Sequence, residues 1–222
     1  MTRGVLAATA GLALLSVAGQ YPLSLDEGTR GFAFETIEYV SYFTIVSNLV
    51  LAAGTALLAT DPRRNETWVV ALRLAGLVMI TVTGIVYHLL LAGDNDPTGI
   101  GVATDLGLHT VVPVLAVVGW LVVGPHRLFG WSILLRAITL PIAWLAYALV
   151  RGFVVGEALY PFMDVATLGV TQVASTVVAI TLFALGLGAV FIAGDRWLPA
   201  PAWASSTSAA EAARPAGASR AP

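Results

Sequence analysis

Six long apolar stretches, separated by short polar segments, dominate this sequence. A helix that spans a bilayer needs roughly 20 mostly apolar residues, and each stretch is long enough. Because the bilayer core offers no water to the backbone, we expect each stretch to be a helix. The sequence therefore predicts an all-α fold, a polytopic membrane helical bundle with six transmembrane helices. The predicted spans are residues 4–20, 39–60, 68–92, 102–123, 131–150 and 168–194.

The composition leaves no room for a water-soluble domain. Hydrophobic residues make up 58% and charged residues 11% of the 222 positions, which excludes an ordinary soluble chain. We assign residues 1–197 to one transmembrane domain. Residues 198–222 are rich in Ala, Ser, Pro and Arg, so they cannot build a core and are predicted to form a disordered C-terminal tail. The absence of cysteine excludes disulfides, thiolate nucleophiles and Cys metal sites.

The arginines predict the orientation of the chain. Short loops that stay in the cytoplasm are enriched in Lys and Arg. With the N-terminus inside, only Arg30 and Arg151 lie on the outer side. We therefore expect a multi-pass protein of the cell membrane with both termini in the cytoplasm and an acidic outer face. The inner arginines are Arg3, Arg63, Arg64, Arg73, Arg127, Arg136, Arg196, Arg214 and Arg220.

The first apolar stretch allows two interpretations. It precedes small residues, which is also typical of a secretory signal peptide. Its apolar run is longer than that of an ordinary signal peptide, so an uncleaved anchor is favoured. Cleavage would leave the other five spans in the same orientation.

Polar residues gather near the outer ends of three predicted spans. The second span enters from outside, and its polar residues, Thr44 and Asn48 among them, lie roughly 3 to 14 Å below the outer boundary. His88 lies about one turn below that boundary on the third span. On the fourth span, Asp105 and His109 lie one turn apart on one face. We expect all five residues to line one pocket that opens outward.

These residue types are suited to nucleophilic catalysis. A threonine hydroxyl is a poor nucleophile until a base takes its proton, and a neutral imidazole is the usual base. Asp105 can hold the His109 ring and fix its tautomer. Alternatively, it is a hydrated carboxylate at the membrane–water interface without a catalytic role. Asn48 or Ser47, about one turn from Thr44, can donate a hydrogen bond to an oxyanion.

Each residue also has a structural interpretation. A Thr or Ser in a membrane helix most often bonds a carbonyl one turn earlier or a neighbouring helix. Asn48, taken alone, is better explained as a helix-packing group. The histidines carry more weight, because ionisable residues inside membrane spans are costly and usually mark a functional interior.

Three short stretches resemble, in this order, the androgen-induced family of integral membrane hydrolases, which has many bacterial relatives. They are YFTIVSNLV around Thr44, LHTVVPVL from Leu108 and LYPFMD from Leu159 to Asp164. The resemblance covers the second to sixth spans. It implies an enzyme that uses an intramembrane Thr and His to hydrolyse fatty acid esters of hydroxy fatty acids. It assigns the nucleophile to Thr44 and the histidine to His109.

The chain departs from the animal members of that family. Those members carry an acid one residue closer to the Thr, where this chain reads TIVSN, and a Glu in place of Asp164. His88, within VYHLLL, belongs to the bacterial pattern and receives no role from the resemblance. Tyr160 and Phe162 also fit an aromatic belt that anchors the sixth span. The substrate therefore stays open and can be another lipid ester.

The favoured function is an intramembrane threonine hydrolase of lipid esters, without cofactor or metal, whose partner is a lipid substrate within the bilayer. Nucleic acid is not expected, and the sequence indicates no protein partner. A haem- or metal-binding redox protein using His88 and His109 stays open. So does a small transporter, although the chain lacks clear internal repeats. Besides Thr44 and His109, the residues expected to support the pocket are Ser47, Asn48, His88, Asp105 and Asp164.

Overall fold

The computed structural model describes residues 2–94 and 96–199. In these residues every regular element is helical, and six helices are long and apolar enough to cross a membrane. The predicted all-α bundle of six spans is therefore confirmed. Of the predicted tail, residues 200–222 lie outside the described residues. The spanning helices are Thr2–Asp26, Phe43–Thr60, Thr67–Leu91, Ile100–Val123, Trp131–Val155 and Val165–Trp197.

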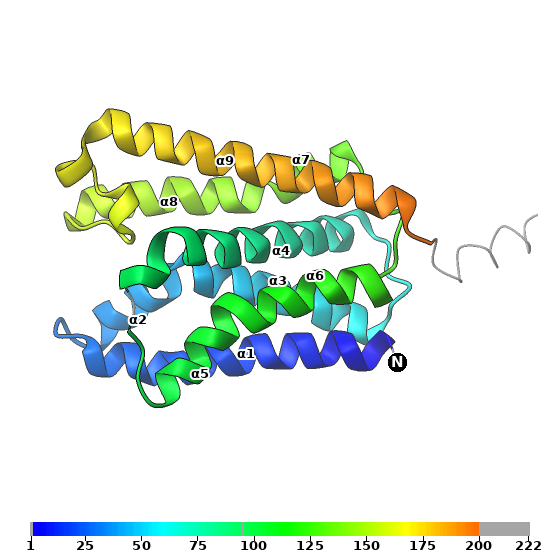
Figure 1. Cartoon of the computed structure of the whole chain (residues 1–222), viewed down its shortest axis with the longest axis horizontal. Coiled ribbons are helices and arrows are strands. Elements are labelled where there is room, and N and C mark those ends of the chain that lie inside the picture. Colours follow the sequence, from blue (N-terminus) through cyan, green and yellow to red (C-terminus); the bar gives the residue numbers. More distant parts are fainter. Residues whose placement is uncertain (1, 95, 200–222) are drawn as a thin grey trace, which may run out of the picture.

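The helices run side by side along one axis (Figure 1). Helices α8 and α9 form one side of the bundle, α4 lies in the middle, and α3, α6 and α1 lie on the other side. The central position of α4 explains why it is the most buried span. The elements are α1 (Thr2–Glu27), α2 (Phe32–Ser41), α3 (Phe43–Thr60), α4 (Thr67–Val86), α5 (Ile100–Leu106), α6 (Val112–Val123), α7 (Trp131–Ala137), α8 (Thr139–Val155) and α9 (Val165–Trp197).

Helices α3 and α4 pack closely through a small residue. A Cβ atom added at Gly76 would lie only 3.0 Å from the Leu51 Cα atom. Around this contact Leu74, Met79 and Ile80 of α4 are fully buried. Because lipid tails are as apolar as these side chains, close packing is what holds membrane helices together. The contact fixes α3, whose first turn belongs to the candidate site.

The two ends of the bundle differ in structure. The end with Thr2, called the N-terminal end, also holds the C-termini of α3, α6 and α9 (Figure 1). There the buried Asp195 accepts backbone hydrogen bonds from Leu128 at 2.7 Å and Phe129 at 2.8 Å, which ties the loop before α7 to α9. The opposite end, called the far end, holds α2, α5 and the short 3₁₀ helix Pro161–Met163.

The second predicted span is interrupted near its start. The prediction of one helix over residues 39–60 was wrong there, because α2 ends at Ser41 and Tyr42 is extended, with φ −64° and ψ 135°. Helix α3 begins at Phe43. Trp144 Nε1 donates to the Ser41 carbonyl at 2.8 Å, and the Phe43 N–H donates to the Tyr160 hydroxyl at 2.9 Å. Backbone groups freed by the break are thus satisfied inside the protein, as a membrane requires.

Two π-helical turns lie at the far end, Tyr87–Leu91 after α4 and Gly107–Val111 between α5 and α6. A π turn adds one residue to a helical turn and is frequent at functional sites. Pro113 favours the second turn, because it has no N–H to bond the His109 carbonyl four residues earlier. The two turns carry His88 and His109, the two histidines predicted for the site.

Candidate active site

Thr44, His109 and Asp105 form a continuous chain of contacts at the far end. Thr44 Oγ1 lies 3.2 Å from His109 Nε2, and His109 Nδ1 lies 3.0 Å from Asp105 Oδ1. Thr44 comes from α3, Asp105 from α5, and His109 from the π turn that follows α5. The order of groups is the one that an activated nucleophile, its base and an orienting carboxylate require.

Tyr87 holds the same imidazole from another segment. Its ring stacks on the His109 ring with centroids 3.7 Å apart and planes at 6°. Its hydroxyl donates to Asp105 Oδ2 at 2.8 Å. With Nδ1 donating to the carboxylate, Nε2 is the nitrogen that can accept the Thr44 proton. Sequence reasoning missed Tyr87, although its place directly before His88 at the end of a span was visible.

Thr44 is the second residue of α3. The first N–H groups of a helix have no partner within it, and the N-terminus carries partial positive charge. The Tyr160 hydroxyl accepts the Phe43 N–H and lies within hydrogen-bonding reach of the Thr44 backbone and side chain. Burial raises the pKa of Tyr160 to about 12, so this hydroxyl keeps its proton at neutral pH. The Tyr160 hydroxyl therefore lies between the start of α3 and the Thr44 side chain.

Ser47 and Asn48 lie beneath Thr44, and both are fully buried. Ser47 Oγ lies 2.7 Å from Thr83 Oγ1 and donates to the Thr44 carbonyl at 3.0 Å. Asn48 Nδ2 donates to the Thr44 carbonyl at 2.8 Å and to the Leu108 carbonyl at 3.4 Å. Their donors thus face backbone carbonyls of α3 and the neighbouring π turn, an arrangement that favours helix packing over the predicted contact with an oxyanion.

His88 lies apart from this chain of contacts. Its Nε2 atom is 3.0 Å from Thr110 Oγ1, and its side chain is exposed. It lines an open groove of about 500 Å³ between α4 and α6. The Tyr87 ring packs against both imidazoles, with its centroid 5.2 Å from that of His88 and 3.7 Å from that of His109. His109 lines this groove as well, so the two histidines share the groove and the Tyr87 ring, but only His109 contacts Thr44 and Asp105.

Asp164 also lies apart from Thr44. It caps α9, since its Oδ1 accepts the Ala166 N–H at 2.9 Å and its Oδ2 accepts the Thr167 hydroxyl at 2.8 Å. The Thr167 hydrogen bond, followed by the backbone bonds, lowers the pKa of Asp164. In the same LYPFMD stretch, Tyr160 is only 8% exposed and stacks on Phe162. An exposed aromatic belt therefore does not describe Tyr160, which belongs to the site.

Thr44 lines two cavities of different character. One, of about 510 Å³, lies at the far end and is called the polar cavity, although polar and apolar atoms line it about equally. The other, of about 90 Å³, lies between α4, α8 and α9 and is almost entirely apolar. The two share Thr44, Tyr87, Leu91 and Tyr160. The polar cavity also has Gln20, Ser24, Arg30, Glu35, Glu38, Asp105 and His109 in its lining.

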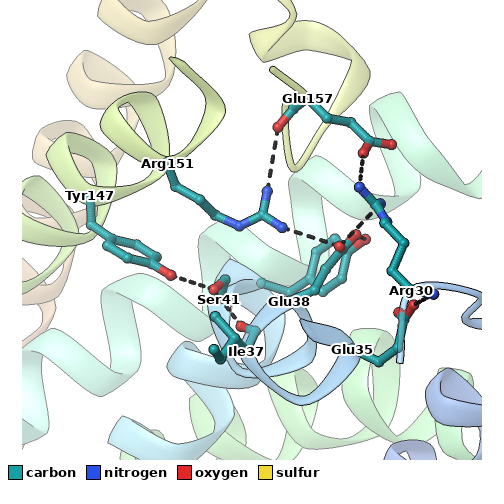
Figure 2. A network of polar contacts seen from close by, with 9 residues as sticks. Arg30, Glu35, Ile37, Glu38, Ser41, Tyr147, Arg151 and Glu157 are labelled. Carbon is teal, nitrogen blue, oxygen red and sulfur yellow. Dashed lines mark hydrogen bonds and ion pairs between the residues drawn. The ribbon is translucent and has the colours of Figure 1, made fainter. Parts of the chain in front are cut away.

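A network of charged side chains borders the polar cavity (Figure 2). Glu38 pairs with Arg151 at 3.1 Å and with Arg30 at 3.4 Å, and Arg30 pairs with Glu157 at 2.6 Å. Arg151 is buried, whereas Arg30 and Glu157 are partly exposed. The network joins the segment before α2 to α2 itself, to α8 and to the loop after α8 (Figure 2). Sequence reasoning used these two arginines only for orientation.

In the part of the chain that the structure describes, no three His, Asp or Glu side chains come together as a group that could hold a metal ion. No protein-family model, curated protein or solved structure matches the chain. The resemblance to the androgen-induced family therefore stays a prediction that rests on three short stretches of sequence.

Proposed function

We propose that the protein is an integral membrane hydrolase that cleaves lipid esters with Thr44 as nucleophile and His109 as general base, at a site that opens to the outer side of the cell membrane. The observation that carries the proposal is the 3.2 Å contact between Thr44 Oγ1 and His109 Nε2, with the opposite ring nitrogen 3.0 Å from Asp105. The resemblance of the surrounding sequence supports the same pair.

The first half of the reaction transfers the acyl group to Thr44. His109 Nε2 takes the hydroxyl proton as Oγ1 attacks the ester carbonyl, and Asp105 stabilises the imidazolium that forms. The Tyr160 hydroxyl is the donor available to the tetrahedral oxyanion, because it accepts the Phe43 N–H and keeps its own proton to donate. Collapse breaks the bond to the alcohol, which leaves with the proton from His109.

The second half returns the enzyme to its starting state. Water in the polar cavity gives a proton to His109 Nε2 and attacks the acyl-threonine carbonyl. The Tyr160 hydroxyl stabilises the second oxyanion as well. Collapse releases the fatty acid and returns the proton to Thr44, so the net reaction consumes one water for each ester.

The orientation rests on the arginines. Most of those in the described part of the chain flank the N-terminal end, and Arg30 and Arg151 lie at the far end. Since arginine is retained on the cytoplasmic side, the far end faces outward and the termini face the cytoplasm. The ester of an outer-leaflet lipid, just beneath the headgroups, then lies at the height of Thr44.

The direct test is labelling of Thr44. An active-site-directed fluorophosphonate should label the purified wild-type protein, and Thr44→Ala should lose both the label and ester hydrolysis because no nucleophilic oxygen remains. Thr110→Ala is the matched control, since Thr110 also contacts a histidine, at 3.0 Å, but lies outside the chain of three. It should keep the label. A Thr44→Ala protein that hydrolysed lipid esters at the wild-type rate would contradict the proposal.

A further inference from the structure

Of the two cavities that share Thr44, one is almost entirely apolar and the other carries charged side chains, and this difference indicates which half of an ester each holds. We infer that the substrate is an ester of one unbranched fatty acyl chain with a small, polar, uncharged alcohol such as glycerol. The acyl chain lies in the apolar cavity and the alcohol in the polar cavity. This inference rests on the proposed function, and it departs from the substrate that the sequence resemblance implies.

The apolar cavity is narrow enough for a single acyl chain and long enough for the part of that chain nearest the ester. From Tyr87 it follows α4 as far as Val78, nine residues or about 13 Å along the helix axis. Ile138 of the α7–α8 junction and Ala184 of α9 also line it. Its volume of about 90 Å³ over that length makes it a narrow slot. Apolar walls favour methylene groups, because no polar group is left unpaired by their entry.

The polar cavity disfavours a second alkyl chain. Besides Thr44 and His109, the cavity is lined by the charged Arg30, Glu35 and Glu38, next to an apolar part that includes Ile45 and Leu108. The charged part is the one considered for the alcohol. An alkyl chain placed there would remove water from charged groups without replacing their hydrogen bonds, which is costly. Hydroxyl groups of a polar alcohol can instead bond to carboxylate oxygens and to the guanidinium group.

The charge of the polar cavity also disfavours an anionic alcohol. Arg30 is the basic side chain in its lining, together with three carboxylates, those of Glu35, Glu38 and Asp105. Arg151 approaches from the side of α8, where Glu38 and the Glu157 carbonyl bind it. A hydroxy fatty acid would bring one more carboxylate into this surplus of negative charge, and like charges at short range repel. The alcohol half is therefore neutral.

The first arm of the test compares three substrates in detergent micelles with purified wild-type protein. These are palmitoylglycerol, butyrylglycerol and the palmitoyl ester of hydroxystearic acid. We expect palmitoylglycerol to have a kcat/KM at least about tenfold above that of the hydroxystearate ester, the size of effect that a mismatched pocket produces. A higher value for the hydroxystearate ester would overturn the inference.

The second arm blocks the apolar cavity. Ala184→Phe places a ring in the slot, so the ratio of palmitoyl- to butyrylglycerol hydrolysis should fall about tenfold or more while butyrylglycerol is still hydrolysed. Ala179→Phe, on the exposed side of the same helix, is the matched control and should keep the wild-type ratio. Val177→Trp, with exposed Val178→Trp as its control, repeats the test at a partly buried position if Ala184→Phe does not fold.

The outcomes separate the two proposals. An unchanged ratio in a folded cavity variant would overturn the acyl assignment even though esters are hydrolysed through Thr44. If none of the three esters were hydrolysed in a Thr44-dependent way, the proposed function itself would fail, and the substrate assignment would fail with it.

Discussion

In the proposed mechanism Thr44 is the nucleophile, and a threonine hydroxyl is weak without a base. His109, the proposed base, lies 3.2 Å from it, Asp105 holds the other ring nitrogen, and Tyr87 stacks on the ring. A second pair, Thr110 with His88 at 3.0 Å, has the same two residue types but an exposed histidine. The molecule thus contains its own comparison between a supported Thr–His pair and a simpler one.

The histidines should respond differently to mutation. In the proposed mechanism His109→Ala removes the general base, a group that typically contributes ~10²–10⁴-fold to rate, and kcat for ester hydrolysis should fall by that order. His88→Ala removes contacts to Thr110 and to the Tyr87 ring but none to Thr44, and it should cost less than about tenfold, below the general-base range. The measurement is kcat of the two purified variants and the wild type. The amount of each protein recovered from the membrane is compared to show that the variants fold. A loss below tenfold in His109→Ala would indicate that this residue only packs.

The sequence predicted part of this arrangement. Asp105 and His109 are four residues apart, so the sequence alone predicted that they lie on one helical face. The contact between the Asp105 carboxylate and His109 Nδ1 agrees with that prediction. Tyr160 could not be found in that way, because it reaches Phe43 across 117 positions. Tyr87 was missed for another reason: its contacts to His109 and Asp105 join two separate spans, and spacing within one span does not predict them.

At the scale of elements, the break between α2 and α3 gives the site its donors. Had the second span been continuous from residue 39, the N–H groups of Phe43 and Thr44 would be bonded within the helix. The break frees them, and the Tyr160 hydroxyl meets them. No Gly or Pro marks this position in the sequence, so a composition-based prediction runs the helix through it. Trp144 and Tyr160, both distant in the chain, stabilise the broken ends.

The break leads to a prediction about Tyr160. In Tyr160→Phe the ring still packs, but the hydroxyl near Thr44 is lost, so kcat should fall by about 10²-fold, as when one oxyanion donor is removed. KM for the ester should change little. Tyr147→Phe is the matched control, because its hydroxyl contacts Ser41 Oγ at 2.5 Å, next to the break but away from Thr44. Equal kcat values for the two variants would argue against a role for Tyr160 in stabilising the oxyanion.

At the scale of the whole molecule, the two ends of the bundle differ: one holds a buried contact between a loop and α9, and the other holds the candidate site. Asp195 holds the loop before α7 at the N-terminal end. The far end carries the polar cavity, bordered by the pairs of Glu38 with Arg30 and Arg151. Bundle architecture and span number could be predicted because lipid imposes length and apolarity on each helix. The cavities could not, because they depend on side chains of four or more helices.

Orientation can be tested with introduced cysteines, since the chain has none. The Asp96→Cys variant, at the far end, should react with a membrane-impermeant thiol reagent in intact cells. The Arg64→Cys variant, at the N-terminal end, should react only after the membrane is permeabilised. Labelling of both variants in opened membranes controls for reactivity. The reverse pattern would invert the assignment of the two sides.

The position of Thr44 between the two cavities also imposes an order in time. While an acyl group is bound to Thr44 and its chain fills the narrow slot, the departing alcohol leaves space in the polar cavity, between Thr44 and His109. In the proposed mechanism water attacks from that space, so the second step of a ping-pong cycle follows the release of the first product. A single threonine placed at this boundary is thus enough to keep the two half-reactions in sequence.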